Sequence, residues 1–408
     1  MKVIKVFFTI IGCAIIAFGA YSAVDFMLAR DFAPEEEVVA VPEEEVLPEE
    51  PVVEEEPEAE PEEEVGDPEE TARLSRAQEL LDGMSQDEKI YQLMFVSPEA
   101  VTGVETATQA GDATKSALAD YPVGGLYYGQ LNVLDAEQLS ALTSNTVSYM
   151  AENGSIAPFM GIYEDGSSIS PLVSFLNGEA LDSFSAVGET ANTGEATQLA
   201  VDLSEALVEY NFNANFASGV DLFDADTAFG TDGAAVAEMA GAYVTGMHSQ
   251  NVAAVLGHFP GEGSSLNAET EQSLEDFMAN DILPFAAGME AGACMIQVSN
   301  MTATGLDYLP CCLSSVVMDD LLRNELGYSG VIITDPLGGV TISAEYDPNE
   351  AAVMALEAGA DMVFGLTDPA GAHDSIAAAI EDGTLTAEQI DASVLRILCA
   401  KLQLGIIE

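Results

Sequence analysis

Short apolar segments alternate with longer amphipathic segments throughout residues 71–408. Within the apolar segments, polar residues are few, a pattern typical of strands that are buried on both faces of a parallel sheet. Eight such segments can be recognised, at residues 92–96, 123–128, 159–163, 212–217, 253–258, 294–298, 331–334 and 361–364.

Amphipathic helical segments lie between most of these strands, for example at 195–209, 234–249 and 315–326. Ser85 and Glu88 have the spacing of a capping box that begins a helix, and Gly327 stands where a helix should end. The repeated alternation of strand and helix predicts an α/β fold, a (β/α)8 TIM-like barrel with an outer ring of helices.

In a barrel of this kind, the loops at the carboxyl ends of the strands converge on one mouth and carry the chemistry. The polar residues at or after the carboxyl ends of the predicted strands are Tyr163, Asp221, His258, Asn300 and Asp335. We therefore expect the candidate functional site at this mouth.

The first 30 residues have the composition of a membrane anchor or a signal segment. Lys2 and Lys5 precede the uncharged stretch 6–24, which as a helix would span roughly 28 Å, close to the hydrocarbon thickness of a bilayer. Basic residues before the stretch favour a single-pass transmembrane helix at the cell membrane, with the rest of the chain outside the cytoplasm. The alternatives are a cleaved signal peptide, which would give a secreted protein, and lipidation at Cys13.

Residues 31–70 form a low-complexity segment in which runs of glutamate are interleaved with proline, and no basic residue occurs there. Because like charges repel and proline favours extended geometry, we predict a disordered, semi-stiff spacer. An acidic interaction tail is the alternative. The remaining residues, 71–408, have a length that suits one large domain.

The whole chain is strongly acidic, with 70 Asp and Glu, 10 Lys and Arg, and a formal net charge of −60. A nucleic-acid binder needs clustered basic residues, yet no Lys or Arg occurs between Lys115 and Arg323. Nucleic acid is therefore excluded as a partner. The acidity indicates a solvated, self-repelling surface, and a site in this domain should favour neutral or cationic ligands.

The cysteines do not have the spacing of a metal site. They are Cys13, Cys294, Cys311, Cys312 and Cys399, with no C-x-x-C pair and no accompanying histidines. We therefore expect no metal and no cofactor. Cys294 and Cys399 lie in apolar segments, where a free cysteine behaves as a small buried hydrophobe, although disulfides outside the cell are an alternative.

The loop Gly257-His258-Phe259-Pro260-Gly261 resembles the K-H-F-P-G loop of family 3 glycoside hydrolases. Other segments resemble the same family in the same order, at 84–93, 123–126, 281–285, 322–335 and 390–405. Together they cover nearly all of residues 80–406. The single-domain length is similar to the β-N-acetylhexosaminidase branch, whose members release N-acetylglucosamine from cell-wall fragments or chitin-like chains.

The resemblance implies a retaining glycosidase, which needs a carboxylate nucleophile about 5 Å from a proton-donating acid. Asp335 occupies the position of the nucleophile, although Pro336 replaces the acidic residue that usually follows. The Asp-x-His pair that supplies the proton in the hexosaminidase branch reads Ala268-Glu269-Thr270. Glu262 and Glu269 are the candidate acids, provided that partial burial raises the pKa of one of them.

Several positions that bind sugar in the family also differ. The D-Q-E-G-G-R stretch reads Tyr163-Glu164-Asp165-Gly166-Ser167-Ser168, Gly257 replaces the lysine, and Thr227 replaces the arginine of the R-S-F-G segment. Each lost charged partner costs about 1.5–3 kcal/mol of binding, so the ligand, a neutral or amino-sugar glycan, should be recognised differently. The remaining candidates for substrate binding are His258, Asp221, Tyr163 and Asp165.

Three functions remain open. The first is an active hydrolase of the β-N-acetylhexosaminidase type with altered specificity, which would use Asp335 and a glutamate acid. The second is a pseudoenzyme that binds glycans at the cell surface without hydrolysis, and the third is a structural or protein-partner role in which the mouth is incidental. The missing acid and the lost binding groups favour the second and third over hydrolysis.

Overall fold

The computed structural model describes residues 68–167, 170–172, 181–222, 227–261 and 274–408. Within these ranges, eight parallel strands form a closed barrel in sequence order, and the first pairs with the last. They are β1 (Met94–Val96), β2 (Gly125–Tyr128), β3 (Phe159–Ile162), β4 (Ala214–Asn215), β5 (Ala253–Phe259), β6 (Met295–Val298), β7 (Val331–Pro336) and β8 (Met362–Phe364). The predicted α/β barrel is confirmed.

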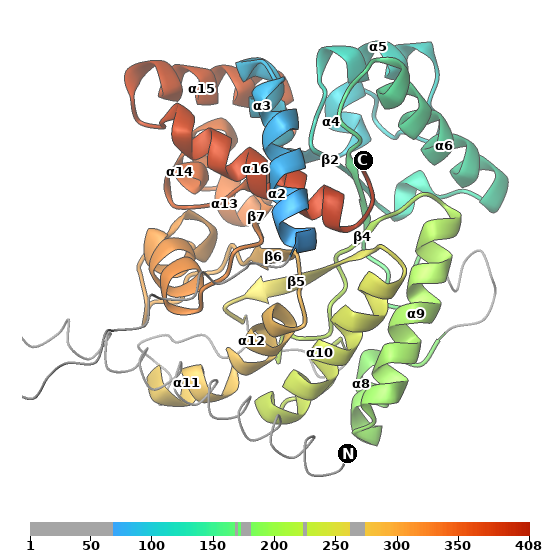
Figure 1. The fold of residues 1–408 in the computed structure, drawn as a ribbon, viewed down its shortest axis with the longest axis vertical. Helices are drawn as coiled ribbons and strands as arrows, with labels where there is room; N and C mark the ends of the chain where they lie inside the picture. Colours follow the sequence, from blue (N-terminus) through green and yellow to red (C-terminus); the bar gives the residue numbers. More distant parts are fainter. Residues whose placement is uncertain (1–67, 168–169, 173–180, 223–226, 262–273) are drawn as a thin grey trace, which may run out of the picture.

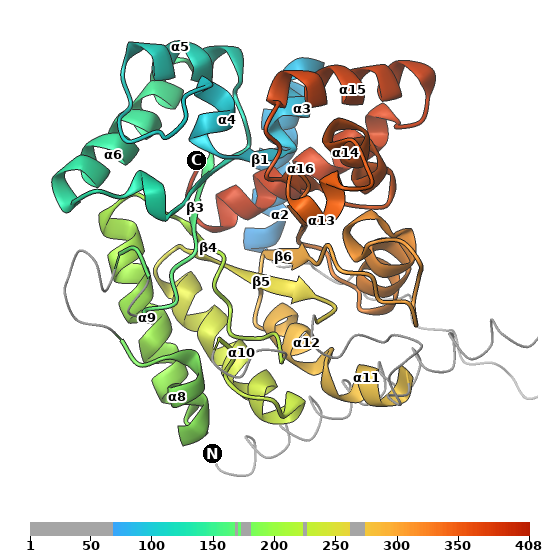
Figure 2. The same ribbon diagram turned by 180° about the vertical axis from the view of Figure 1, so that it is seen from behind.

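Helices surround the barrel on all sides (Figures 1 and 2). Those before β5 are α2 (Pro68–Asp82), α3 (Gln86–Gln92), α4 (Pro98–Thr102), α5 (Asp112–Asp120), η1 (Gln130–Asn132), α6 (Ala136–Glu152), α8 (Phe184–Thr190), α9 (Thr193–Glu209) and α10 (Gly233–Ser249). Those after β5 are α11 (Leu274–Asn280), α12 (Leu283–Glu290), η2 (Cys311–Leu313), the π-helix η3 (Val316–Glu325), α13 (Val340–Ser343), α14 (Pro348–Glu357), α15 (Pro369–Asp382) and α16 (Ala387–Gln403).

Helix α2 begins at Pro68, so residues 68–70, which the sequence analysis placed in the spacer, are helical. Proline fits the first turn of a helix, and acidic residues there complement the helix dipole. The helix packs beside α16 (Figure 1), and Arg76 Nε donates a hydrogen bond to the carbonyl of Glu408 at 2.9 Å. No helix of the described ranges is both long and apolar enough to cross a membrane. The predicted anchor lies outside those ranges.

The local signals for helix ends are confirmed. Ser85 caps α3, and its side chain and that of Glu88 form both bonds of the capping box. This hydrogen bonding lowers the pKa of Glu88. Gly327 adopts a φ of 67°, a left-handed conformation that glycine accepts without strain.

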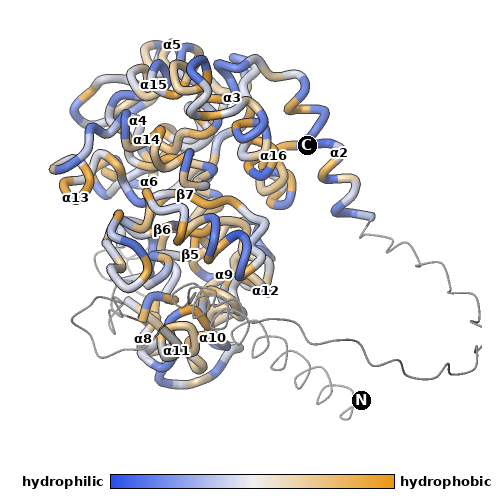
Figure 3. Tube along the Cα trace, turned by 90° about the vertical axis from the view of Figure 1, so that its left-hand side faces the viewer, coloured by the Kyte–Doolittle hydropathy of each residue, from blue (hydrophilic) through white to orange (hydrophobic). Residues whose placement is uncertain are grey.

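Aromatic side chains fill the barrel interior. Phe95 packs edge-on against Phe216 and Phe364, with ring centroids 5.3 and 5.8 Å apart. A Cβ atom at Gly161 would lie 2.7 Å from the ring of Phe95, so the glycine makes room for this ring. Hydrophobic residues run through β5, β6 and β7, whereas the exposed helix α2 carries more hydrophilic ones (Figure 3). The barrel is therefore a packed core, and a ligand site must lie at its end or its edge.

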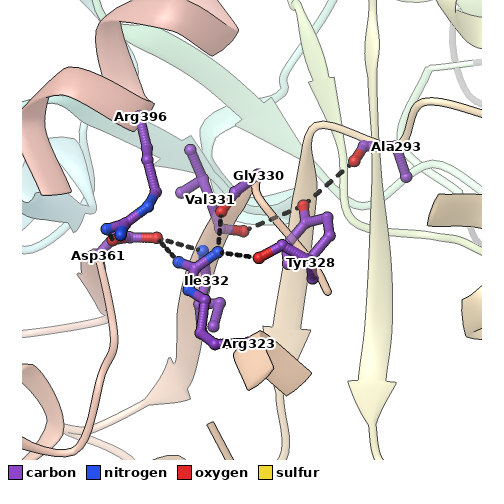
Figure 4. A network of polar contacts seen from close by, with 8 residues as sticks. All are labelled: Ala293, Arg323, Tyr328, Gly330, Val331, Ile332, Asp361 and Arg396. Atoms are coloured by element: carbon purple, nitrogen blue, oxygen red, sulfur yellow. Dashed lines mark hydrogen bonds and ion pairs between the residues drawn. The ribbon is translucent and has the colours of Figure 1, made fainter. Parts of the chain in front are cut away.

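An ion network joins β7 and β8 at their amino ends (Figure 4). The carboxylate of Asp361 is fully buried and receives Nη2 of Arg323 on one oxygen and Nη1 of Arg396, at 2.8 Å, on the other. The backbone N–H of Ile332 also donates to it, at 2.8 Å. Arg323 in turn donates to the carbonyl of Tyr328 at 2.9 Å. The network ties η3 and α16 to two adjacent strands.

Lys401 of α16 is a second buried ionisable side chain. Its Nζ donates to Oε1 of Gln92 at 2.8 Å and lies 5.3 Å from the ring centroid of Phe159. Burial lowers the pKa of this lysine to about 7, because the protein interior disfavours the charged form.

Replacing Lys401 with methionine is expected to stabilise the domain, most strongly below pH 7. In the unfolded chain this lysine keeps its usual pKa. Between about pH 7 and pH 10 its amine is therefore protonated in the unfolded state and neutral in the native state. Because the unfolded state binds more protons in this window, the stability of the wild-type protein rises with pH. The advantage of Lys401→Met should therefore shrink across this window. Denaturant unfolding at pH 6 and pH 9.5 measures it. Lys115→Met, at a half-buried lysine that pairs with Glu152, is the control. An advantage of Lys401→Met that does not change with pH would contradict the prediction.

Candidate active site

Asp335 lies near the carboxyl end of β7, and only 5% of its side chain is exposed. Nε2 of Gln297 donates to Oδ1 at 2.6 Å, and the backbone N–H of Asn300 donates to Oδ2 at 3.0 Å. These two donors, from β6 and the loop after it, fix the orientation of the carboxylate and offset the cost of burying it.

His258 stands between two carboxylates. Its Nε2 lies 3.7 Å from Oδ1 of Asp335, and its Nδ1 lies 3.8 Å from Oδ2 of Asp221. The imidazole is 38% exposed, more than either carboxylate, so it faces the open side of the site. The structure thus brings together Asp221, His258, Asn300 and Asp335, as expected from their places after the strands.

The loop that carries His258 is anchored on both sides. Oγ of Ser218 donates to the carbonyl of Gly257 at 2.9 Å and accepts from its N–H at 3.2 Å. Phe259 is fully buried and packs edge-on against Phe285 of α12, with ring centroids 5.2 Å apart. The N–H of Gly261 donates to the carbonyl of His258 at 2.7 Å. These contacts hold the backbone of the loop in place, and they thereby fix where the imidazole of His258 lies.

The loop after β3 contains the other two predicted binding residues. Tyr163 directly follows the strand and is 38% exposed, which places its phenol at the rim of the mouth. Asp165 is half-buried, and its Oδ1 accepts the N–H of Ser167 at 2.9 Å. This hydrogen bond closes a local turn. Among the described residues, Asp165 forms no hydrogen bond with Asp335 or His258.

Two further residues organise this rim. Glu164 is fully buried, and its carboxylate accepts the N–H groups of Gly166 at 3.0 Å and Leu172 at 2.7 Å. Asn215, at the end of β4, accepts the N–H of Glu164 at 3.0 Å and donates to its carbonyl at 2.8 Å. The loop after β3 is therefore tied to the end of β4.

No sequence motif marks Gln297, Ser218 or Asn215 as residues of the site. Each is a polar residue within or just after an apolar strand segment, and each is buried. A buried polar side chain needs a hydrogen-bond partner, so a polar residue in an apolar strand is the signal that could have found them.

The candidate acids Glu262 and Glu269 lie outside the described residues. So does Ser168, whereas Thr227, which stands for the arginine of the family, is exposed. Within the described ranges, no group of three or more His, Cys, Asp or Glu side chains could hold a metal ion. The chemistry that can be assigned from geometry is that of a fixed carboxylate beside an imidazole.

A cavity of about 800 Å³ lies elsewhere, beside the amino ends of β6 and β7. Its walls come from α2, α12 and α16, and include Arg73, Met289, Cys294 and Tyr328. Cys294 is an unpaired, buried thiol, and burial raises its pKa to about 12. Because the barrel chemistry belongs to the carboxyl ends of the strands, we place the candidate site at the mouth and not in this cavity.

The profile of the glycosyl hydrolase family 3 N-terminal domain matches residues 85–400. Beta-hexosaminidase LpqI of Mycobacterium tuberculosis is 28% identical over 339 residues, which are 78% of this chain and 83% of that protein. The structure of M. tuberculosis LpqI superposes with a TM-score of 0.67 at 26% identity, covering 79% of this chain and 95% of that one. A family 3 beta-N-acetylglucosaminidase from Paenibacillus sp. FPU-7 gives a TM-score of 0.71 at 26% identity, covering 79% of this chain and 63% of that one. The chain belongs to glycosyl hydrolase family 3.

Proposed function

We propose that this chain hydrolyses β-linked amino-sugar glycosides with retention of configuration, and that Asp335 is the nucleophile. One observation carries the proposal: the Asp335 carboxylate is held by Gln297 and Asn300 at the barrel mouth, directly beside His258. A barrel with only a structural role would not need a buried carboxylate held beside an imidazole at this end of the barrel. The amino-sugar class of substrate is supported by the beta-hexosaminidases among the relatives.

In the proposed reaction, Asp335 attacks the anomeric carbon and forms a covalent glycosyl ester while the bond to the leaving oxygen breaks. Glu262 or Glu269 gives the proton to that oxygen. Water then attacks the same carbon, gives its proton to the ionised glutamate, and frees Asp335. His258 and Asp221 bind hydroxyl groups of the sugar at the mouth.

The test uses the purified full chain with 4-nitrophenyl N-acetyl-β-glucosaminide. We expect release of nitrophenol, a β-configured first product by NMR, and a covalent adduct on Asp335 with a fluorinated sugar inactivator. Glu262→Gln and Glu269→Gln identify the acid, because loss of the acid should slow poor leaving groups far more than a dinitrophenyl group. The absence of both turnover and adduct would contradict the proposal.

A glycan-binding role without hydrolysis is the second candidate. It is favoured by Ala268-Glu269-Thr270 in place of the Asp-x-His pair, and by the glycine and threonine at positions 257 and 227. This role predicts that chitobiose binds to the protein in calorimetry and is not cleaved over days. A protein-partner role predicts that chitobiose is neither bound nor cleaved.

We also propose that residues 1–30 anchor the chain in the cell membrane, with the barrel outside the cytoplasm. The basic Lys2 and Lys5 and the uncharged stretch 6–24 support this orientation. The full chain should sediment with membranes, and protease added to intact cells should digest the barrel. A barrel that is protected in intact cells, or a chain found only in the medium, would contradict the anchor.

A further inference from the structure

Gln297 is a buried polar residue in the strand next to the candidate nucleophile. We propose that Gln297 positions the carboxylate of Asp335, and that the glycine at position 257 leaves the space that the Gln297 side chain occupies. The inference rests on the hydrolysis proposed above, and it concerns how this chain holds the carboxylate of its nucleophile.

The first evidence is the contact itself. Gln297 lies in β6, is 4% exposed, and donates to Oδ1 of Asp335 at 2.6 Å. Its neighbours in the strand, Met295, Ile296 and Val298, are apolar and buried. Burying an amide in such a strand is costly unless the amide is hydrogen-bonded. The bond to Asp335 offsets that cost.

The second evidence is the fit between Gln297 and Gly257. A Cβ atom at Gly257 would lie 3.1 Å from Oε1 of Gln297 and 3.2 Å from its Cβ, closer than ordinary packing. Ser218 holds both backbone polar groups of Gly257, so the loop has little freedom to retreat. Any larger side chain at position 257 therefore competes with Gln297 for one space.

The third point is chemical. A lysine at position 257, as in the resembling loop, would bring positive charge to the site. The amide of Gln297 brings a directed hydrogen bond without charge. With the N–H of Asn300 on the other oxygen, the carboxylate of Asp335 is held in one orientation. Gln297 contacts Asp335 directly, so we expect it to act on the rate through Asp335.

The test compares Gln297→Met with the wild-type full chain. The variant keeps the size of the side chain but loses the donor, so kcat should fall by about 100-fold while KM stays within about threefold. The acidic limb of the pH–rate profile should move to higher pH, because the carboxylate loses a hydrogen bond that favours its charged form. Gln297→Leu, which also lacks the donor and adds no charge, should show the same two changes. Unchanged unfolding transitions establish that both variants are folded.

A pair of substitutions tests the shared space. Gly257→Ala alone should lower kcat, because the added Cβ atom displaces Gln297, whereas the same change in a Gln297→Ala background should alter kcat by less than about twofold. If Gly257→Ala lowers kcat equally in both backgrounds, the shared-space argument is wrong.

A carbon-13 NMR titration of the Asp335 carboxyl separates this inference from the proposed hydrolysis. The signal is assigned with Asp335→Asn. If the wild type does not turn over but Gln297→Met changes the titration, the positioning role stands and hydrolysis is refuted. If the wild type turns over, and Gln297→Met keeps its kcat, pH profile and titration, the positioning role is refuted.

Discussion

Asp335→Asn should lower kcat on aryl amino-sugar glycosides by on the order of 10⁴-fold or more, since loss of a nucleophile removes the covalent route entirely. The amide keeps the size of the carboxylate, and its oxygen can still accept one of the bonds from Gln297 and Asn300. The fold should therefore survive, and sugar binding by calorimetry should persist. Initial rates with nitrophenyl substrate, beside an unfolding curve for each protein, measure the effect.

Rescue by an external nucleophile makes the same experiment specific to the role of Asp335. In Asp335→Gly, azide should enter the space of the missing carboxylate, attack the anomeric carbon, and give an α-glycosyl azide while the nitrophenol leaves. Asp221→Asn is the matched control, because Asp221 lies 3.8 Å from His258 on the other side of the imidazole. That variant should mainly raise KM and should not be rescued. Wild-type turnover by Asp335→Asn would refute the assignment.

The barrel could be predicted because its signal is repeated and local. Each strand is buried on both faces, and therefore appears as an apolar run that does not depend on its neighbours. Strand ends are less well determined, since they depend on pairing: the segment predicted at 212–217 pairs only over Ala214–Asn215, and the one predicted to end at His258 continues to Phe259.

The candidate site could be predicted only in part, because some of its contacts depend on which strands and loops lie side by side. Residues at or after the carboxyl end of a strand, such as Asp221, His258 and Asp335, must lie at the mouth of any such barrel. Gln297 lies within a strand, and its contact with Asp335 depends on the side-by-side placement of β6 and β7. The turn that uses Asp165 depends on loop geometry that no periodic pattern encodes.

Asp361→Asn should lower the free energy of unfolding by about 3–5 kcal/mol, the usual cost of removing one partner from a buried ion pair. The carboxylate is fully buried and neutralises both Arg323 and Arg396 (Figure 4). Asparagine has the same shape but no charge, so two guanidinium groups would lose their counter-ion at once. Its amide could accept only some of the bonds that the carboxylate receives, including that of Ile332.

The measurement is the denaturant midpoint of the variant beside that of Asp120→Asn, an exposed aspartate whose loss should shift the midpoint little. Because Asp361 precedes β8, it lies at the end of the barrel opposite the mouth. Below its unfolding transition, Asp361→Asn should therefore keep the ligand affinity and kcat of the wild type, whereas Asp335→Asn should lose kcat without a comparable loss of stability. A midpoint for Asp361→Asn within the error of the control would show that the network is not what holds η3 and α16 to the strands.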